Sequence, residues 1–465
     1  MIGGYNQNAK DKPLKPYQIT AAEWLLDRWY VQGHKGCGLF LDPGLGKTRV
    51  TLTAIDYLMK LGEIRKVLIV APLRPVYFVW PAEIREWGFP QSNIVLHNQM
   101  TQALKEDCQI EIINYESLAK LKGFKRRWDL LVLDESTWIK TWGTQRAKSV
   151  RAVLPTIPKR LILTGTPGSN SLGDLHSQIY VLDDGESLGK TVTYFRSTYM
   201  TRGGFQGRQW ILQKGREKEL QDLIRDKTLR MQAEDHLDMP RIVKNDVWIE
   251  LPANCAGEYN RLKRELKAHL DAGELLVGSA AAAYAKCRQF ANGTVYQMQD
   301  DDTKISIKVH DEKIQAICDV FEELSGKPLL IFYNYSHDRE RLLARPQFRR
   351  APVIRGKMKM AEVKKILANW NEGAYPAILC QWQAASHGLN MQRACNDVAC
   401  FGVVDSPDTY DQAFRRVYRQ GVQGTQVRIH RFLARKTVDA VMLDRLEGKI
   451  ATQDAFLQAL KRHGD

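Results

Sequence analysis

A glycine-rich segment near the N-terminus has the residue types of a phosphate-binding loop. The apolar residues Gly38 to Leu41 predict a buried strand, the sequence DPGLGKT follows and ends at Thr48, and residues 49–60 predict a helix. A loop between a strand and a helix N-terminus surrounds an anion with backbone N–H groups. The segment therefore predicts a nucleotide-phosphate site; the alternative is an ordinary turn.

Each residue type in this loop has a chemical task. Gly44 and Gly46 would let the backbone approach phosphate oxygens, and Lys47 would reach the β- and γ-phosphates. The Thr48 hydroxyl could ligate Mg²⁺. The residues expected to line the nucleotide site are Pro43, Gly44, Leu45, Gly46, Lys47 and Thr48.

A pair of acidic residues at the end of another apolar run could complete this site. The run begins at Asp129 and ends with Asp134 and Glu135. Asp134 would hold Mg²⁺, directly or through water, and Glu135 would polarise the attacking water. Such a pair is also common as a plain strand terminus, but the phosphate loop favours the catalytic interpretation.

A third candidate is a basic helix in the C-terminal half. Ser406 provides an N-cap type and Gly421 a stop, and Gln412, Arg416 and Arg419 are spaced to share one stripe. On its own the stripe is typical of a solvated face. Because a phosphate loop needs cations for the charge that develops on the γ-phosphate, we expect these residues to act as arginine fingers.

Two series of short apolar runs predict the elements that position these residues. Each series alternates with amphipathic text, which is typical of a parallel sheet covered by helices. We predict one lobe over residues 1–239, with a helical protrusion near 185–235, and a second over 240–465, with a helical insertion near 253–312. The runs of the first lobe are Gly38–Leu41, Val67–Ala71, Ile110–Ile113, Leu130–Leu133 and Leu161–Leu163. Those of the second are Leu329–Phe332, Pro352–Ile354, Ala377–Cys380, Val398–Val404 and Val427–Phe432.

Composition limits the class of protein. The 465 residues include 68 Lys and Arg against 53 Asp and Glu, and this excess of positive charge favours a polyanionic partner such as DNA. The eight cysteines form no CxxC pair, so reduced thiols in an intracellular protein are expected. No apolar run reaches the roughly 20 residues that span a bilayer, and the start has no signal-peptide core, so no membrane partner is expected.

Taken together, these motifs resemble the Swi/Snf-type family of superfamily 2 helicase-like ATPases. The resemblance extends from Leu14 to about Asp439. It rests on LKPYQIT, DPGLGKT, KVLIVAPL, INYESL, DEST, LTGTPGSN, LIFY, GLN and QAFRRVYRQG, which occur in family order. It implies an α/β fold of two RecA-like parallel-sheet lobes, with a helical insertion between the two motif sets.

The resemblance also implies roles for residues whose local sequence does not indicate a function. Gln18 would contact the adenine base, and Thr137 stands where the family commonly has a histidine. Residues that couple the nucleotide state to DNA grip would include Thr164, Gly165, Thr166, Gly388 and Asn390. Nucleic-acid contacts are expected at Arg74, Asn114, Tyr115, Asn334, Tyr335 and Ser336.

The function implied is an ATP- and Mg²⁺-dependent, nucleic-acid-stimulated hydrolase. It would translocate on double-stranded DNA without sequence specificity and remodel DNA or DNA–protein complexes. A strand-separating DNA helicase is the alternative and would need a wedge. A nucleotide switch without turnover fits Lys47 and Glu135 poorly, and a P-loop kinase leaves the second lobe unexplained. Because the motifs nearly fill the chain, we expect a cytoplasmic protein of bacterial or viral origin.

Three basic clusters could contact phosphates: Lys122–Trp128, Arg202–Trp210 and Arg349–Lys357. For each, a solvated surface is an equal alternative. The glycines of the second cluster predict a hairpin. Its residues Phe205 to Trp210 are also the best candidate for a helicase wedge.

Overall fold

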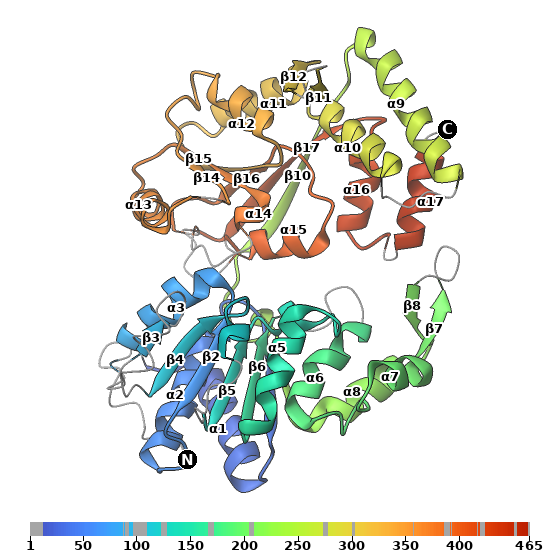
Figure 1. Ribbon diagram of the computed structural model, residues 1–465. Coiled ribbons are helices and arrows are strands. Elements are labelled where there is room, and N and C mark those ends of the chain that lie inside the picture. Colours follow the sequence, from blue (N-terminus) through green and yellow to red (C-terminus); the bar gives the residue numbers. More distant parts are fainter. Residues whose placement is uncertain are drawn as a thin grey trace. The chain divides into compact units, whose positions relative to one another are not determined.

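The chain forms two compact units, Met1–Asp238 (unit 1) and Met239–Asp465 (unit 2), each with its own parallel sheet. Figure 1 shows the computed structural model, with unit 1 in blue to green and unit 2 in yellow-green to red. It describes residues 13–86, 88, 93–95, 109–121, 128–165, 172–203, 209–272, 278–299, 303–356, 358–385, 391, 393–415, 417–418, 424–450 and 453–463.

The sheet of unit 1 has seven parallel strands in the order β3-β4-β2-β5-β6-β1-β9. Its central strands are short apolar runs that are buried throughout or nearly so, as expected for a sheet covered on both faces. The strands are β1 (Gly36–Leu41), β2 (Val67–Ala71), β3 (Asn93–Val95), β4 (Ile110–Asn114), β5 (Leu130–Asp134), β6 (Lys159–Thr164) and β9 (Thr228–Met231).

Helices connect these strands and pack on the sheet. Buried side chains such as Val150, Ile179 and Phe195 join the strands in one hydrophobic cluster. Each fully buried Val, Leu, Ile or Phe side chain contributes about 1.5–3 kcal/mol, so the sheet edge that carries the functional loops is held rigidly. The helices are α1 (Pro16–Leu26), α2 (Lys47–Lys60), α3 (Leu73–Glu86), α5 (Gln145–Val153), α6 (Leu175–Asp183), α7 (Val192–Tyr199) and α8 (Glu217–Ile224).

The protrusion of unit 1 is only partly helical. Between α7 and α8 lies an antiparallel hairpin of β7 (Met200–Gly203) and β8 (Gln209–Leu212), which projects away from the main sheet (Figure 1). The hairpin predicted at Arg202–Trp210 is therefore confirmed, and it lies between two helices of the protrusion expected near 185–235.

Unit 2 contains six parallel strands in the order β10-β17-β16-β13-β15-β14. The edge strand β10 pairs with β17 over nine residues, from Arg241 opposite Gln426 to Ile249 opposite Ala434. The strands are β10 (Arg241–Ile249), β13 (Leu329–Tyr333), β14 (Val353–Ile354), β15 (Ala377–Gln381), β16 (Asp397–Cys400) and β17 (Gln426–Ala434).

Helices cover this second sheet and extend it into a helical group. One hydrophobic cluster joins α9, α10, α16 and α17 through residues such as Tyr259, Cys287, Met442 and Phe456. Besides the helices expected near 253–312, the insertion contains a small hairpin, β11 (Thr294–Met298) with β12 (Lys304–Lys308). The helices are α9 (Ala253–Asp271), α10 (Ser279–Ala291), α11 (Glu312–Glu323), α12 (Ser336–Leu343), α13 (Met360–Asn371), α14 (Trp382–Ala385), α15 (Pro407–Phe414), α16 (Val438–Leu446) and α17 (Gln453–His463).

The predicted helix from Ser406 to Gly421 is shorter than expected. The Ser406 hydroxyl caps it by accepting from the N–H of Thr409 at 3.2 Å, but α15 ends at Phe414. The N–H groups of Val417 and Tyr418 both donate to the Phe414 carbonyl, which closes the helix in a turn. The expectation of one helix that runs to Gly421 is therefore wrong. Arg416 and Arg419, which were expected to share a stripe with Gln412, lie outside the described residues.

Candidate nucleotide site and the motifs of unit 2

The glycine-rich loop follows β1 and leads into α2. Gly44 and Gly46 have φ values of 96° and 78°, in the left-handed region that glycine adopts without a steric cost. A Cβ on Gly46 would lie 2.5 Å from Nε2 of Gln18, so a larger residue would have to displace the Gln18 side chain and would also be strained at this φ. The helix begins at Lys47, which places its free N–H groups and positive dipole end at the loop. This is the arrangement that the sequence predicts for a phosphate cradle.

Lys47 and Asp42 fix the two ends of the loop. Nζ of Lys47 donates to the Leu41 carbonyl at 2.7 Å, so the ammonium group lies over its own loop. The Asp42 carboxylate accepts from the N–H of Ala233 at 3.1 Å, which ties the loop to the residues after β9. The loop is thus shaped by the protein alone, before any phosphate contributes.

Gln18 connects α1 to this loop. Its side chain is only 5% exposed; its Oε1 accepts from the N–H of Lys15 and its Nε2 donates to the Leu45 carbonyl, both at 3.1 Å. The neighbouring Tyr17 ring stacks on His236 with centroids 5.1 Å apart. Gln18 therefore stands at the loop, where the predicted adenine contact would have to be.

The acidic residues stand at the end of β5. Nε1 of Trp80 donates to Oδ2 of Asp134 at 2.9 Å, and the Tyr115 hydroxyl donates to the Asp134 backbone carbonyl at 2.9 Å. Burial raises the pKa of the Asp134 carboxyl to about 6; the charge of Glu135 adds to this, while Trp80 and Lys47 oppose it. Asp134 and Lys47 are therefore close enough to interact electrostatically.

Glu135 is held in an unusual backbone conformation. Its φ of 54° lies in the left-handed region, which costs a residue with a Cβ roughly 1–2 kcal/mol. Its carboxylate accepts from the Thr137 hydroxyl at 3.4 Å, and Ser136 donates to Gln178 at 2.7 Å. Backbone strain of this kind is concentrated at functional sites, so Glu135 is a candidate for a role in the reaction.

The strand order brings these parts to one edge of the sheet. β6 lies between β5 and β1, and the carboxyl ends of parallel strands share an edge. β6 ends at Thr164, which is fully buried, and a Cβ on Gly165 would lie 2.8 Å from Cδ of Pro43. The predicted coupling residue Gly165 therefore lies against the phosphate loop, and Thr164 precedes it at the end of β6, paired with Phe40 of β1. The others, Thr166, Gly388 and Asn390, lie outside the described residues.

The donor set fits magnesium better than a metal held by protein alone. Mg²⁺ usually takes one or two protein oxygens together with phosphate oxygens and waters, and Thr48 and Asp134 supply such a pair. Among the described residues, no group of three or more His, Cys, Asp and Glu could hold a metal ion.

Two aromatic partners of the acidic strand could not be predicted. Trp80 is fully buried in α3, and Tyr115 is 1% exposed. Their hydrogen bonds to residue 134 depend on the packing of α3 and β4 against β5, for which no local pattern exists. The sequence assigned Tyr115 to nucleic acid, but its hydroxyl is engaged with Asp134. Arg74 and Asn114, assigned likewise, are 7% and 3% exposed.

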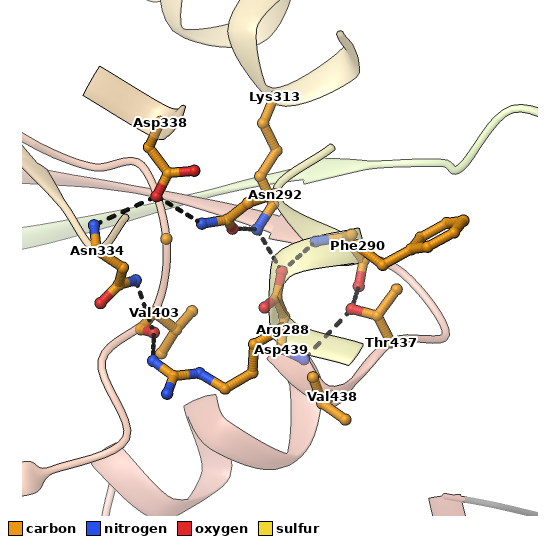
Figure 2. Close-up of polar contacts among 12 residues, drawn as sticks. Arg288, Phe290, Asn292, Lys313, Asn334, Asp338, Val403, Thr437, Val438 and Asp439 are labelled. Atoms are coloured by element: carbon orange, nitrogen blue, oxygen red, sulfur yellow. Dashed lines mark hydrogen bonds and ion pairs between the residues drawn. The ribbon is translucent and has the colours of Figure 1, made fainter. Parts of the chain in front are cut away.

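Unit 2 contains a buried polar network next to the turn at residues 334–336, which the sequence predicts to contact nucleic acid (Figure 2). The fully buried Lys313 donates to Asp439 at 2.6 Å and to the Asn292 side-chain oxygen at 3.0 Å. The Asn292 amide nitrogen donates to Asp338 at 3.1 Å. Burial of these groups is tolerated because each charge has a partner.

This network continues into the turn before α12. Asp338 accepts the backbone N–H groups of residues 334 and 335 at 3.3 and 3.0 Å. The Asn334 side chain donates to the Val403 carbonyl at 3.2 Å, and Arg288 donates to the same carbonyl at 3.2 Å and to Asp405 at 3.1 Å (Figure 2). The turn is thus tied to the loop before α15, while Ser336 is exposed.

A phosphate loop and an acidic strand end in one parallel-sheet unit, followed by a second such unit, define a helicase-like P-loop ATPase. Residues 17–301 match the SNF2-related domain, and residues 312–421 match the helicase conserved C-terminal domain. The chain therefore belongs to the SNF2-related family, and the sequence predictions of a Swi/Snf-type ATPase and of two RecA-like lobes are confirmed.

Relatives of this chain include proteins of phage and yeast. A phage protein, putative protein p41 of Acyrthosiphon pisum secondary endosymbiont phage 1, is 31% identical over 96% of this chain and 98% of its own length. The chromatin structure-remodeling complex subunit snf21 of Schizosaccharomyces pombe is 25% identical over 96% of this chain, which spans only 39% of that relative.

A solved structure, the SWI2/SNF2 ATPase core of Sulfolobus solfataricus in complex with dsDNA, is 22% identical with a TM-score of 0.46; the match covers 96% of this chain and 94% of that one. In the part of the chain that the structure describes, no helix is both long enough and apolar enough to span a bilayer.

Proposed function

We propose that this chain hydrolyses ATP in a nucleic-acid-stimulated cycle and uses the cycle to translocate on double-stranded DNA. Membership of the SNF2-related family indicates an ATP hydrolase. The observation that carries the proposal is the meeting of the Lys47 loop with Asp134 and Glu135 at one sheet edge of a SNF2-related chain.

Each residue of the edge has a defined task in hydrolysis. The N–H groups of the loop and the Lys47 ammonium bind and orient the β- and γ-phosphates. Glu135 holds the attacking water and accepts its proton. Thr48 and Asp134 would hold Mg²⁺, which when bound neutralises charge on the phosphate oxygens. Gln18 would read the adenine base.

Unit 2 would supply the remaining groups. Gln412, Arg416 and Arg419 would stabilise charge on the γ-phosphate when nucleic acid closes the two units. The network that ties Asn334 to Val403 supports this proposal, because it links the turn expected to meet nucleic acid to the loop before Gln412. Duplex DNA of any sequence is the proposed track, since no base-reading motif is present in the sequence.

A bacterial or viral origin fits the phage relative. We propose DNA-bound proteins as the targets of translocation. The strand-separating alternative would need a wedge, for which the β7–β8 hairpin is the candidate.

The test of the proposed function is an ATPase titration. We expect hydrolysis to be slow without nucleic acid and slow with RNA. The rate should rise somewhat with single-stranded DNA and most with duplex DNA. The Lys47→Ala variant controls for contaminating ATPases. A rate that is the same with and without duplex DNA would refute the proposal.

A further inference from the structure

Part of the positive charge of the chain is concentrated in the protrusion of unit 1. Residues 187–216 contain no Asp or Glu. Their basic residues are Lys190, Arg196, Arg202, Arg208, Lys214 and Arg216. These six account for a large part of the excess of 15 positive charges in 465 residues. Residues 187–216 of the protrusion thus form a basic segment that the ATP site does not use.

Two of these arginines converge on one indole ring. Arg202 of β7 is paired in register with Trp210 of β8, and its guanidinium carbon lies 4.2 Å from the ring centroid. Arg196, on the neighbouring helix α7, lies 5.5 Å from the same centroid. Trp210 is partly buried and packs against the hydrophobic core of unit 1. We call Arg196, Arg202 and Trp210 the Arg–Trp platform.

The positive charges of the platform are not neutralised by the described acidic side chains. Both arginines are exposed, and among the described side chains neither forms an ion pair with a carboxylate. Two like charges on one ring repel each other, and the ring face compensates only partly, by about 0.5–1 kcal/mol at an exposed site. A shared anion would relieve the repulsion. The planar guanidinium presents N–H groups that match phosphate oxygens.

The exposed side chains and the row of basic residues around the platform favour a long polyanion over a small anion. Tyr194 on α7 is 56% exposed and Ile211 on β8 is 37% exposed, so the described side chains around the platform form an open surface. The basic residues extend on both sides of the platform along the sequence, to Lys190 and Lys214. Repeated phosphates spaced along a backbone can engage such a row, whereas one phosphate cannot.

We propose that α7 and the β7–β8 hairpin form a second duplex-binding surface, which holds the DNA phosphate backbone on the Arg–Trp platform. The choice of duplex DNA as the polyanion rests on the proposed function. The surface would add affinity that is independent of base sequence, and it would act as a grip rather than as a wedge between strands.

The test measures the salt dependence of binding to a labelled duplex of mixed sequence. In the Arg196→Gln/Arg202→Gln double variant, two cations are lost while side chains of similar reach remain. We expect the slope of log K against log salt to become shallower by about 2, since each lost phosphate contact removes about 1 from the slope. At salt concentrations between about 50 and 200 mM, the double variant should also bind the duplex at least tenfold more weakly than the wild type.

A matched control removes the same charge from the neighbouring helix region. Lys218 and Arg225 are exposed and are flanked by acidic residues such as Glu219 and Asp222. The Lys218→Gln/Arg225→Gln variant should keep the wild-type slope. Thermal unfolding of both variants reports whether unit 1 is intact.

The outcomes separate this inference from the proposed function. A wild-type protein that binds no duplex at any salt concentration would refute the proposed function. Wild-type binding with an unchanged slope in the platform variant, or equal losses in both double variants, would refute the platform alone. Full duplex affinity with selective loss of strand separation on a forked substrate would make the hairpin a wedge and also overturn the inference.

Discussion

Lys47 and Glu135 belong to different steps of the proposed reaction, so their removal should have different consequences. In Lys47→Ala the loop loses the ammonium group that binds phosphates, and we expect ATP affinity to fall and turnover to disappear. In Glu135→Gln only the activation of water is lost, so ATP should bind normally and remain trapped. Nucleotide-binding titrations with single-turnover hydrolysis measure both steps.

The control for Glu135→Gln is Glu63→Gln, because Glu63 is exposed in the turn after α2. The control should behave as wild type. Turnover near the wild-type rate in Glu135→Gln would show that another residue orients the water.

Trp80 acts on the reaction through Asp134. Trp80→Phe keeps most of the buried ring and deletes the N–H that donates to the carboxylate. Loss of a partner that orients a metal ligand typically costs 10–100-fold in metal affinity. We therefore expect the Mg²⁺ concentration for half-maximal ATPase to rise by roughly tenfold or more, with little change in kcat at saturating Mg²⁺.

An unchanged Mg²⁺ requirement in Trp80→Phe would mean that the hydrogen bond to Asp134 is only structural. Trp138→Phe is a matched control, since the Trp138 ring stacks on Tyr115 and the hydrogen bond from Trp138 to the Glu135 carbonyl comes from the backbone N–H, which the substitution keeps.

At the scale of elements, a buried ion pair joins α11 to α16. Lys313 and Asp439 are 0% and 2% exposed, and Lys313→Met would leave the Asp439 charge buried without its partner. Removal of one partner of such a pair typically costs about 3–5 kcal/mol. We expect urea unfolding of unit 2 to shift by that amount.

The Lys313→Met/Asp439→Asn double variant should recover part of this loss. It removes both charges and keeps an oxygen for the N–H of Ala434, which Asp439 accepts at 2.9 Å. A double variant that is no more stable than Lys313→Met would contradict the role assigned to the unpaired charge.

His310, in the segment between β12 and α11, makes the stability of unit 2 sensitive to acid. Burial lowers its pKa to about 4; nearby Lys313 and Arg341 add to this, and its bond to the Phe290 carbonyl and Asp311 oppose it. In the unfolded chain the pKa is about 6.5. The contribution is therefore fully present above pH 6.5 and is lost as the pH falls toward 4, by roughly 3 kcal/mol in all.

His310→Gln removes this titration and should flatten the dependence. Urea unfolding at pH 7 and near pH 4 measures the difference between variant and wild type. Parallel losses of stability in the two proteins would show that His310 does not contribute.

The sequence predicted most of these elements because parallel strands buried on both faces read as apolar runs. Of the strands in the two main sheets it missed the edge strands β3, β9 and β10. The sequence RIVKNDVWI of β10 is largely exposed or only partly buried, so it does not read as an apolar run. The phosphate loop and the acidic pair were predictable because their spacing is local. Trp80 and Tyr115 were not, because their contacts arise only when distant elements pack together. The end of α15 could not be predicted either, because it is set by the turn in which the N–H groups of Val417 and Tyr418 donate to the Phe414 carbonyl.

At the scale of the whole molecule, translocation requires two units that grip DNA alternately as ATP binds and is hydrolysed. The chain provides two sheets, each with its own hydrophobic cores, joined between Asp238 and Met239. Strand separation would require a further rigid element that keeps the strands apart. The β7–β8 hairpin was the candidate for that element, and we propose instead that it contacts the DNA backbone.

Displacement of a third strand from a DNA triplex tests the central claim most directly, because a protein that moves along a duplex removes that strand without opening base pairs. The account predicts ATP-dependent displacement by the wild type, none by Glu135→Gln, and little release of a labelled strand from a forked duplex. Efficient unwinding of the fork with no displacement of the third strand would contradict it.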